Sequence, residues 1–168
     1  GQLSQQYFLL TLILVTLNKL VCSLKLYQYP NVIHRFKSHN QRERWSRNQA
    51  WLADNSVTIY PGFPDEEFQY EPQKKENTVL FVGRASPVKG IHAFETLARW
   101  NPDYTFILYS KDNYIPKSHN IYAMGELKRG KAHNRAFMDA EKFFMFVKWE
   151  EAFGRVIVEA MSKGTPVL

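Results

Sequence analysis

Residues 151–168 read EAFGRVIVEAMSKGTPVL, and this stretch predicts how the rest of the chain is organised. Glu151 and Glu159 stand eight positions apart, with a Phe-Gly pair and an apolar run between them. We interpret Glu151 as a loop residue, Gly154 as lying at or near the first turn of a helix, and Glu159 as lying one to two turns inside that helix. A helix start offers free N–H groups, and glycine lets a ligand come close to the backbone. The stretch therefore predicts an anion site flanked by two carboxylates that can accept hydrogen bonds from hydroxyls.

A second candidate site is the stretch FVGRASPVKG at residues 81–90, which completes a continuous apolar run. Gly83 permits a tight turn, Arg84 offers a two-pronged donor to phosphate oxygens, and Lys89 offers a compact positive charge. Open α/β sheets bind ligands at the carboxyl ends of their strands, so we expect both motifs at the same edge. A diphosphate would then lie between the two cations and the helix that begins near Gly154. A nucleotide sugar, with hydroxyls on both sides of a diphosphate, has this layout.

The two motifs together resemble those of the family 4 glycosyltransferases. That family carries an E-x7-E motif, usually within E-x-F-G-x-x-x-x-E-A-M-A-x-G-x-P-V, and a G-R-x-x-x-x-K-G motif. The resemblance is strong over residues 78–168 and weak over 55–77. It implies the GT-B fold and retaining transfer of a sugar from a nucleotide-diphosphate donor to a glycan or lipid-linked acceptor. It also implies that no metal or other cofactor takes part; no Asp-x-Asp pair occurs in the sequence, which agrees with this.

The resemblance also assigns a role to individual residues. Glu151 would hold hydroxyls of the transferred sugar, with help from main-chain N–H groups near Phe153 and Gly154. Glu159 would accept hydrogen bonds from the ribose. The catalytic set is Glu151, Arg84 and Lys89. The residues expected to bind the nucleotide sugar are Gly83, Arg84, Lys89, Glu151, Phe153, Gly154, Arg155 and Glu159.

Three positions depart from the family pattern. Lys148 stands where the family often has the serine of a Pro-Ser pair, and Ser110-Lys111 stands where a glycine is common. Ala152 replaces a frequent Gly or Pro. These departures leave the preferred donor open, whereas the class of enzyme rests on the two motifs.

The composition is that of a globular protein with a moderately basic surface. The 168 residues carry a formal net charge of +6 and 45% hydrophobic residues, enough for a packed core. This charge suits nucleotide diphosphates, phospholipid head groups or nucleic acid without choosing among them. Cys22 is the only cysteine, so a disulfide framework within the chain is excluded and we expect a reducing, cytoplasmic compartment. The apolar run at residues 7–17 is short for a membrane span and favours a buried helix.

Strand and helix patterns alternate from residue 78 onward, which is typical of an α/β domain with a Rossmann-like parallel sheet. We expect strands at 78–82, 104–109, 120–123 and 143–147, the start of another at 165–168, and helices at 88–100, 131–140 and 154–163. Before residue 78 we expect a helix at 7–26, strands at 31–34 and 57–60, and a helix that Ser38 caps and that runs to about residue 52.

These elements predict parts of two domains. We interpret residues 1–64 as the tail of an N-terminal, acceptor-side domain and 65–77, which are polar and acidic, as a linker. Residues 78–168 would form the nucleotide-sugar-binding C-terminal domain, incomplete because its last strand lacks a covering helix.

Two other classes of function stay open at this stage. One is a GT-B-related sugar epimerase or phosphorylase. The other is a non-catalytic module whose basic stretch, residues 34–47, binds an anionic surface; this stretch holds five Lys/Arg residues and one acidic residue. We favour a solvated helix face there and expect no nucleic acid, because stacking aromatics are few. An anionic membrane, contacted peripherally by this stretch, stays open as a partner.

Overall fold

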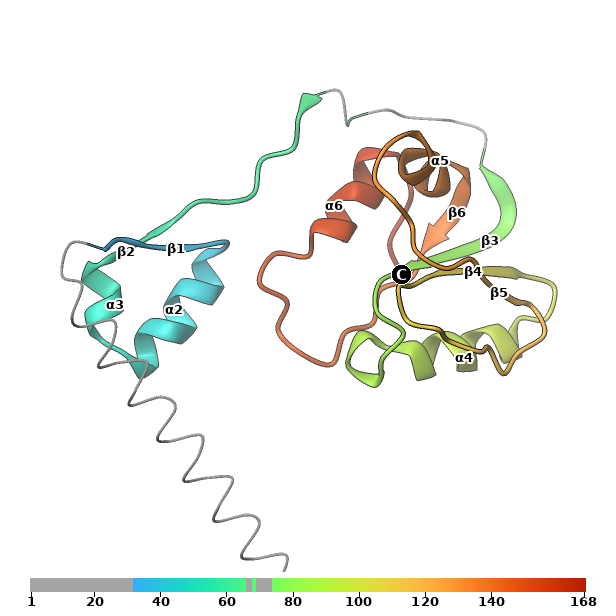
Figure 1. Cartoon of the computed structure of the whole chain (residues 1–168), viewed down its shortest axis with the longest axis horizontal. Helices are drawn as coiled ribbons and strands as arrows, with labels where there is room; N and C mark the ends of the chain where they lie inside the picture. Colours follow the sequence, from blue (N-terminus) through green and yellow to red (C-terminus); the bar gives the residue numbers. More distant parts are fainter. Residues whose placement is uncertain (1–31, 66–67, 69–73) are drawn as a thin grey trace, which may run out of the picture. The chain divides into compact units, whose positions relative to one another are not determined.

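The computed structural model describes residues 32–65, 68 and 74–168 of the chain (Figure 1). The helix predicted at 7–26 lies outside the described residues. The chain divides into two compact units, Gly1–Tyr60 and Pro61–Leu168, which we describe separately. Within the described parts, no helix combines the length and the apolar character that crossing a membrane requires.

The first unit contains a small βαβ arrangement. Strands β1 (His34–Phe36) and β2 (Ser56–Thr58) pair in parallel, and helices α2 (His39–Asn48) and α3 (Trp51–Asp54) connect them. The predicted cap is confirmed, because the Ser38 hydroxyl accepts a hydrogen bond from the Gln41 N–H at 3.2 Å. The single helix expected to about residue 52 is wrong. The backbone of Gln49 leaves the helical region at φ −146°, and a separate short helix follows.

The second unit is built on a four-stranded parallel sheet in the order β5-β4-β3-β6. Its strands are β3 (Lys75–Val82), β4 (Thr105–Tyr109), β5 (Ile121–Ala123) and β6 (Ala140–Phe143). In register, Val79 pairs with Phe106 of β4, and Leu80 pairs with Phe143 of β6. Because all four strands run in the same direction, their carboxyl ends meet at one edge of the sheet.

Helices cover both faces of this sheet, as Figure 1 shows. They are α4 (Ile91–Trp100), α5 (Lys131–Asp139) and α6 (Arg155–Ser162). Alternate residues of β3 point to opposite faces. Val79 and Phe81 pack with Phe94 of α4 in one hydrophobic cluster, whereas Leu80 packs with Phe137 of α5 and with α6 in the other. This doubly covered sheet explains the continuous apolar strand pattern and confirms the α/β, Rossmann-like fold class.

Several element boundaries differ from those predicted. Strand β3 begins at Lys75 rather than 78, and α4 begins at Ile91 because a 3-10 turn, η2 (Pro87–Lys89), and Gly90 at φ +85° precede it. Strand β6 covers Ala140–Phe143 instead of 143–147. The strand expected at 165–168 is a single parallel bridge between Val167 and Phe143. The remaining expected elements of this unit differ by one residue or two.

Candidate functional site

The two sequence motifs meet at the carboxyl edge of the sheet, where the neighbouring strands β3 and β6 end. The Lys148 N–H donates a hydrogen bond of 2.9 Å to the Val88 carbonyl. Gly90 lies against the Phe146 carbonyl so closely that a Cβ at position 90 would be 2.0 Å from the carbonyl oxygen. The loop of residues 83–90 and the segment 144–154 are therefore packed backbone to backbone.

This packing brings Lys89 and Glu151 into direct contact. The Lys89 ammonium lies 2.6 Å from Glu151 Oε2, and the two side chains are 21% and 29% exposed. Trp149 joins them: its indole N–H donates to the same carboxylate oxygen at 2.9 Å, and the Lys89 ammonium lies 4.7 Å from the centre of its ring. Lys89, expected to bind the diphosphate, and Glu151, expected to bind the transferred sugar, thus form one partly exposed cluster with Trp149.

Glu159 lies in a separate and more buried environment. Its side chain is 5% exposed and faces three basic groups. The Arg129 guanidinium is 3.2 Å from Glu159 Oε1, Arg155 Nε is 3.6 Å from the same oxygen, and His133 Nε2 is 3.6 Å from Oε2. A carboxylate at this depth needs such partners, because burying an unpaired charge is costly.

The start of α6 is shaped by Gly154 and Phe63. Gly154 is the N-cap residue, as the sequence predicted, and its φ of +72° lies in the left-handed region that favours glycine. On either side of it, Phe153 stacks on Phe63 with 6.2 Å between ring centres, and the Arg155 guanidinium lies 4.9 Å from the Phe63 ring centre. The Phe63 ring therefore supports the helix start from both sides of its capping glycine.

The loop that carries Arg84 is anchored on both sides of that residue. The Gly83 N–H donates to the Tyr109 carbonyl at 3.0 Å. The Ala85 N–H donates to the Ser110 hydroxyl at 3.1 Å and to an Asp112 carboxylate oxygen at 2.8 Å. Arg84 itself is exposed between these anchors. Ser110, which replaces a glycine common in the resembling family, thus supplies a hydrogen-bond acceptor to this loop.

The structure brings some of the predicted residues together and adds others. It joins Lys89 to Glu151 and Arg155 to Glu159, and gives the two carboxylates different partners. Sequence reasoning missed Trp149, Arg129 and His133. Arg129 follows β5 (Ile121–Ala123), so the rule that placed the other motifs at the carboxyl edge also applied to it.

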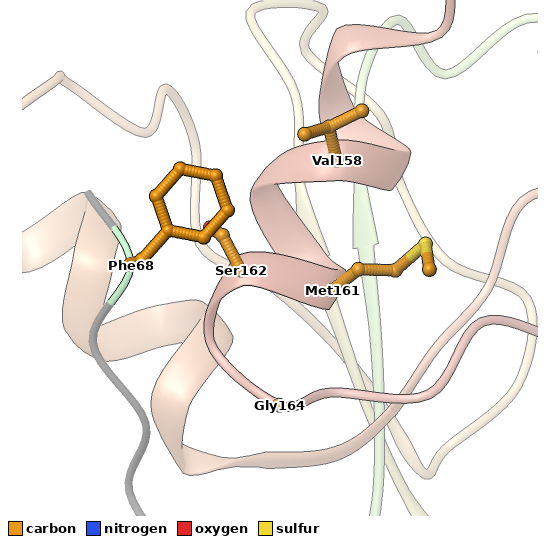
Figure 2. A pocket seen from close by; sticks show the side chains of 5 residues that line it. All are labelled: Phe68, Val158, Met161, Ser162 and Gly164. Carbon is orange, nitrogen blue, oxygen red and sulfur yellow. The ribbon is translucent and has the colours of Figure 1, made fainter. Parts of the chain in front are cut away.

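A pocket of about 450 Å³ lies along the C-terminal half of α6 (Figure 2). Its lining residues are Phe68, Val158, Met161, Ser162 and Gly164. Among the residues that the structure describes, this lining carries no charged side chain and so offers no counter-charge to a diphosphate. The candidate site for an anion is accordingly the edge that carries Arg84, Lys89 and the start of α6.

The parallel sheet covered by helices defines an α/β fold, and the cations and carboxylates at its carboxyl edge define the candidate site. Comparison with known proteins identifies the family. The family described as "Glycosyl transferases group 1" matches residues 62–168. The match extends over more than half of the chain, and the chain therefore belongs to this family of glycosyltransferases.

Solved structures agree on the fold. The chain is similar to Anabaena Alr3699/HepE, solved in complex with UDP and glucose, with a TM-score of 0.67 and 21% identity, covering 80% of this chain and 43% of that one. It is also similar to the pneumococcal O-GlcNAc transferase GtfA, solved with UDP and GlcNAc, with a TM-score of 0.65 and 19% identity over 84% of this chain and 31% of that one. The described domain is thus part of a GT-B fold.

The chain is also similar in sequence to a named enzyme among its curated relatives. The chain is 30% identical over 118 residues to the processive diacylglycerol alpha-glucosyltransferase of Acholeplasma laidlawii. That alignment covers 61% of this chain and 33% of the relative. The chain therefore spans about a third of the length of this relative.

Proposed function

We propose that this chain binds the donor in a glycosyltransferase that moves a sugar from a nucleotide-diphosphate sugar to an acceptor hydroxyl with retention and without a metal ion. The observation that carries the proposal is the contact between Lys89 and Glu151 at the carboxyl edge of the sheet, 2.6 Å apart. It puts a phosphate-binding cation beside a hydroxyl-binding carboxylate. A sugar diphosphate presents the matching groups, a phosphate and a hydroxyl, on neighbouring carbons of the sugar.

The chemistry asks the protein to stabilise a leaving diphosphate. The bond from the anomeric carbon to the diphosphate oxygen breaks, a bond to the acceptor oxygen forms on the same face of the sugar, and the acceptor hydroxyl passes its proton to an oxygen of the leaving diphosphate. Negative charge grows on the diphosphate in the transition state. Fixed cations such as Arg84 and Lys89 then bind the transition state more strongly than the ground state. In this proposal the two cations neutralise the charge of the leaving diphosphate, as a divalent ion does in other transferases.

The division of roles between the two carboxylates belongs to the same proposal. Glu151 is half-exposed beside Lys89 and would accept hydrogen bonds from the transferred sugar. Glu159 would accept hydrogen bonds from the ribose while Arg129, Arg155 and His133 stabilise its charge. Such a carboxylate is oriented before the ligand arrives, which lowers the cost of binding.

For the acceptor, we propose a glycan or a lipid-linked sugar, met at the cytoplasmic face of a membrane. The name of the Acholeplasma relative, a diacylglycerol glucosyltransferase, supports a lipid-like acceptor. In the first unit, Arg44 and Arg47 are exposed on α2, where they can meet anionic head groups.

The test compares two variants against two kinds of ligand. Binding of UDP, GDP and ADP and of their glucose conjugates to residues 1–168 is measured by calorimetry. We expect Glu159→Gln to weaken the nucleoside diphosphate and its conjugate alike, by about tenfold, since both contain ribose. Glu151→Gln should leave the nucleoside diphosphate within about twofold and weaken only the conjugate. Glutamine keeps the side-chain volume, so packing is preserved.

Glu43→Gln is the matched control, because Glu43 is an exposed helix carboxylate that pairs with Arg47 in the other unit. Equal loss of both ligands in Glu151→Gln, with an unchanged melting curve, would refute the division of roles. For the reaction, the protein encoded by the complete reading frame is assayed with and without a chelator, and the anomer of the product is read by NMR. An inverted product, or activity that a chelator abolishes, contradicts the proposal.

A further inference from the structure

Trp149 is bound to two members of the proposed site and belongs to neither motif. Its indole N–H donates to Glu151 Oε2 at 2.9 Å, and its ring face carries the Lys89 ammonium at 4.7 Å. The residue is 44% exposed, so its ring is not simply core filling. A tryptophan that contacts both partners of an ion pair can hold one partner in place when the other moves away.

A diphosphate is expected to disturb this pair. Lys89 has three N–H donors, and its ammonium lies against Glu151 Oε2. A diphosphate is a stronger attractor for an ammonium than one half-exposed carboxylate. When the Lys89 ammonium turns toward the diphosphate, Glu151 loses a close partner. Glu151 must keep its orientation at that point, because it is then to bind the sugar.

We propose that Trp149 is a positioning residue, which holds Glu151 through its indole N–H while Lys89 exchanges the carboxylate for the donor diphosphate. This inference rests on the proposed function and adds a third residue to it. The ring also gives Lys89 a favourable surface on which to turn, because an aromatic face attracts a cation without fixing its direction. Trp149 and Glu151 are two residues apart in one loop, so they keep their spacing while the ammonium moves.

The proposal predicts a selective binding defect. Trp149→Phe keeps an aromatic ring beneath Lys89 but removes the N–H donor, so it separates the two contacts. We expect the nucleoside diphosphate to bind within about twofold of wild type, and its glucose conjugate to bind about fivefold to tenfold more weakly. Glu151→Gln should show the same pattern. The double variant, Trp149→Phe with Glu151→Gln, should bind the glucose conjugate no more weakly than Glu151→Gln alone, since both changes act through the Glu151 side chain.

Tryptophan emission supplies a second measurement. If Trp149 had only a structural role, its emission would not change when nucleotide binds. Departure of the ammonium from the ring face should alter the emission of Trp149 when UDP, GDP or ADP binds. That change should persist in Trp100→Phe, the matched control, whose ring is 77% exposed at the end of α4, and disappear in Trp149→Phe. In the wild-type chain, the Trp149 indole N–H resonance should stay at its hydrogen-bonded position after nucleotide is added.

The outcomes separate this proposal from the proposed function. If the wild-type chain binds none of the nucleotides, both fail. If it binds them but Trp149→Phe equals wild type for both ligands, or weakens both equally, only the role of Trp149 is overturned. Additive losses in the double variant would overturn it as well. If Trp149→Phe melts too low to be measured, the indole resonance of the wild-type chain decides, because loss of its hydrogen bond on nucleotide binding contradicts the proposal.

Discussion

At the residue scale, Arg84 is presented by its neighbours rather than held by its own side chain. Gly83 and Ala85 are both anchored, through Tyr109, Ser110 and Asp112, while Arg84 is exposed between them. The Asp112 carboxylate accepts the Ala85 N–H at 2.8 Å, so it fixes the backbone next to Arg84. A short loop with both flanks hydrogen-bonded presents a guanidinium at low entropic cost.

Removing this guanidinium should therefore weaken the diphosphate contact directly. We expect Arg84→Ala to reduce nucleoside-diphosphate affinity by about 1.5–3 kcal/mol, the usual range for hydrogen bonds to charged groups. Calorimetry on residues 1–168 measures it. Arg99→Ala, an exposed arginine on α4, is the control and should leave affinity unchanged. Unchanged affinity in Arg84→Ala would remove Arg84 from the site.

Another residue-scale prediction concerns Tyr114. Burial, followed by the hydrogen bond to the Glu95 carboxylate and the charge of that carboxylate, together raise the pKa of Tyr114 to about 12. Its hydroxyl lies 3.0 Å from Glu95 Oε1, which also accepts the Lys117 N–H. Since the folded pKa exceeds the unfolded value of about 10, this contact stabilises the fold below pH 10 and is lost as pH rises toward 12.

Spectroscopic titration checks this directly. The tyrosinate absorbance of the wild-type chain should contain a late step near pH 12, and Tyr114→Phe should delete that step while leaving the earlier ones. Glu95→Gln should shift the step to lower pH, because it removes the carboxylate charge. A Tyr114 step at the ordinary tyrosine pKa would contradict the description of this contact.

At the element scale, the junction between η2 (Pro87–Lys89) and α4 sets the distance between the two site loops. Gly90 combines φ +85° with a Cβ direction that meets the Phe146 carbonyl oxygen at 2.0 Å. The Phe146 oxygen belongs to the backbone and the direction of a Cβ at position 90 is fixed by the backbone, so neither atom can rotate away. Gly125 is a useful contrast, since its φ is +76° but nothing lies within 4 Å of its Cβ direction.

Replacing each glycine by alanine separates conformational strain from collision. Gly125→Ala should cost about 1–2 kcal/mol in free energy of unfolding, for the left-handed backbone alone. Gly90→Ala should cost at least about 1–3 kcal/mol more, because it must also separate the two loops. Denaturant unfolding measures both. Equal costs would mean that the contact between Gly90 and Phe146 does not fix the spacing of the two loops.

The same elements show how far the sequence could predict the structure. The apolar strands β3, β4 and β5, the Ser38 cap and a helix start near Gly154 were predictable, because each depends on a local pattern. The start of α4 was missed by three residues, since the 3-10 turn η2 and the left-handed backbone of Gly90, at φ +85°, separate Val88 and Lys89 from the helix. The contacts of Glu159 with Arg129 and His133 join residues about 30 positions apart, and no local pattern specifies them.

At the scale of the whole molecule, the site and its support come from one of the two units. Both hydrophobic clusters are formed by residues between Val79 and Val167. The contacts described for Lys89, Glu151 and Glu159 are also made within Pro61–Leu168. Phe63, which supports the start of α6, lies close to the beginning of this unit. A boundary at residue 61 therefore keeps the support of that helix start, whereas one at residue 78 removes it.

This division predicts different outcomes for two truncations. Residues 61–168 should melt cooperatively and bind the nucleoside diphosphate within about threefold of residues 1–168, a difference below 1 kcal/mol. Residues 78–168 lack Phe63, as well as the Lys74 ammonium that donates to the Lys163 carbonyl and the Thr165 hydroxyl, so they should melt at a lower temperature. Circular dichroism and calorimetry on the three chains measure both quantities. If residues 61–168 fold but lose the nucleotide, side chains before residue 61 must contribute to its binding, and the donor site described here is incomplete.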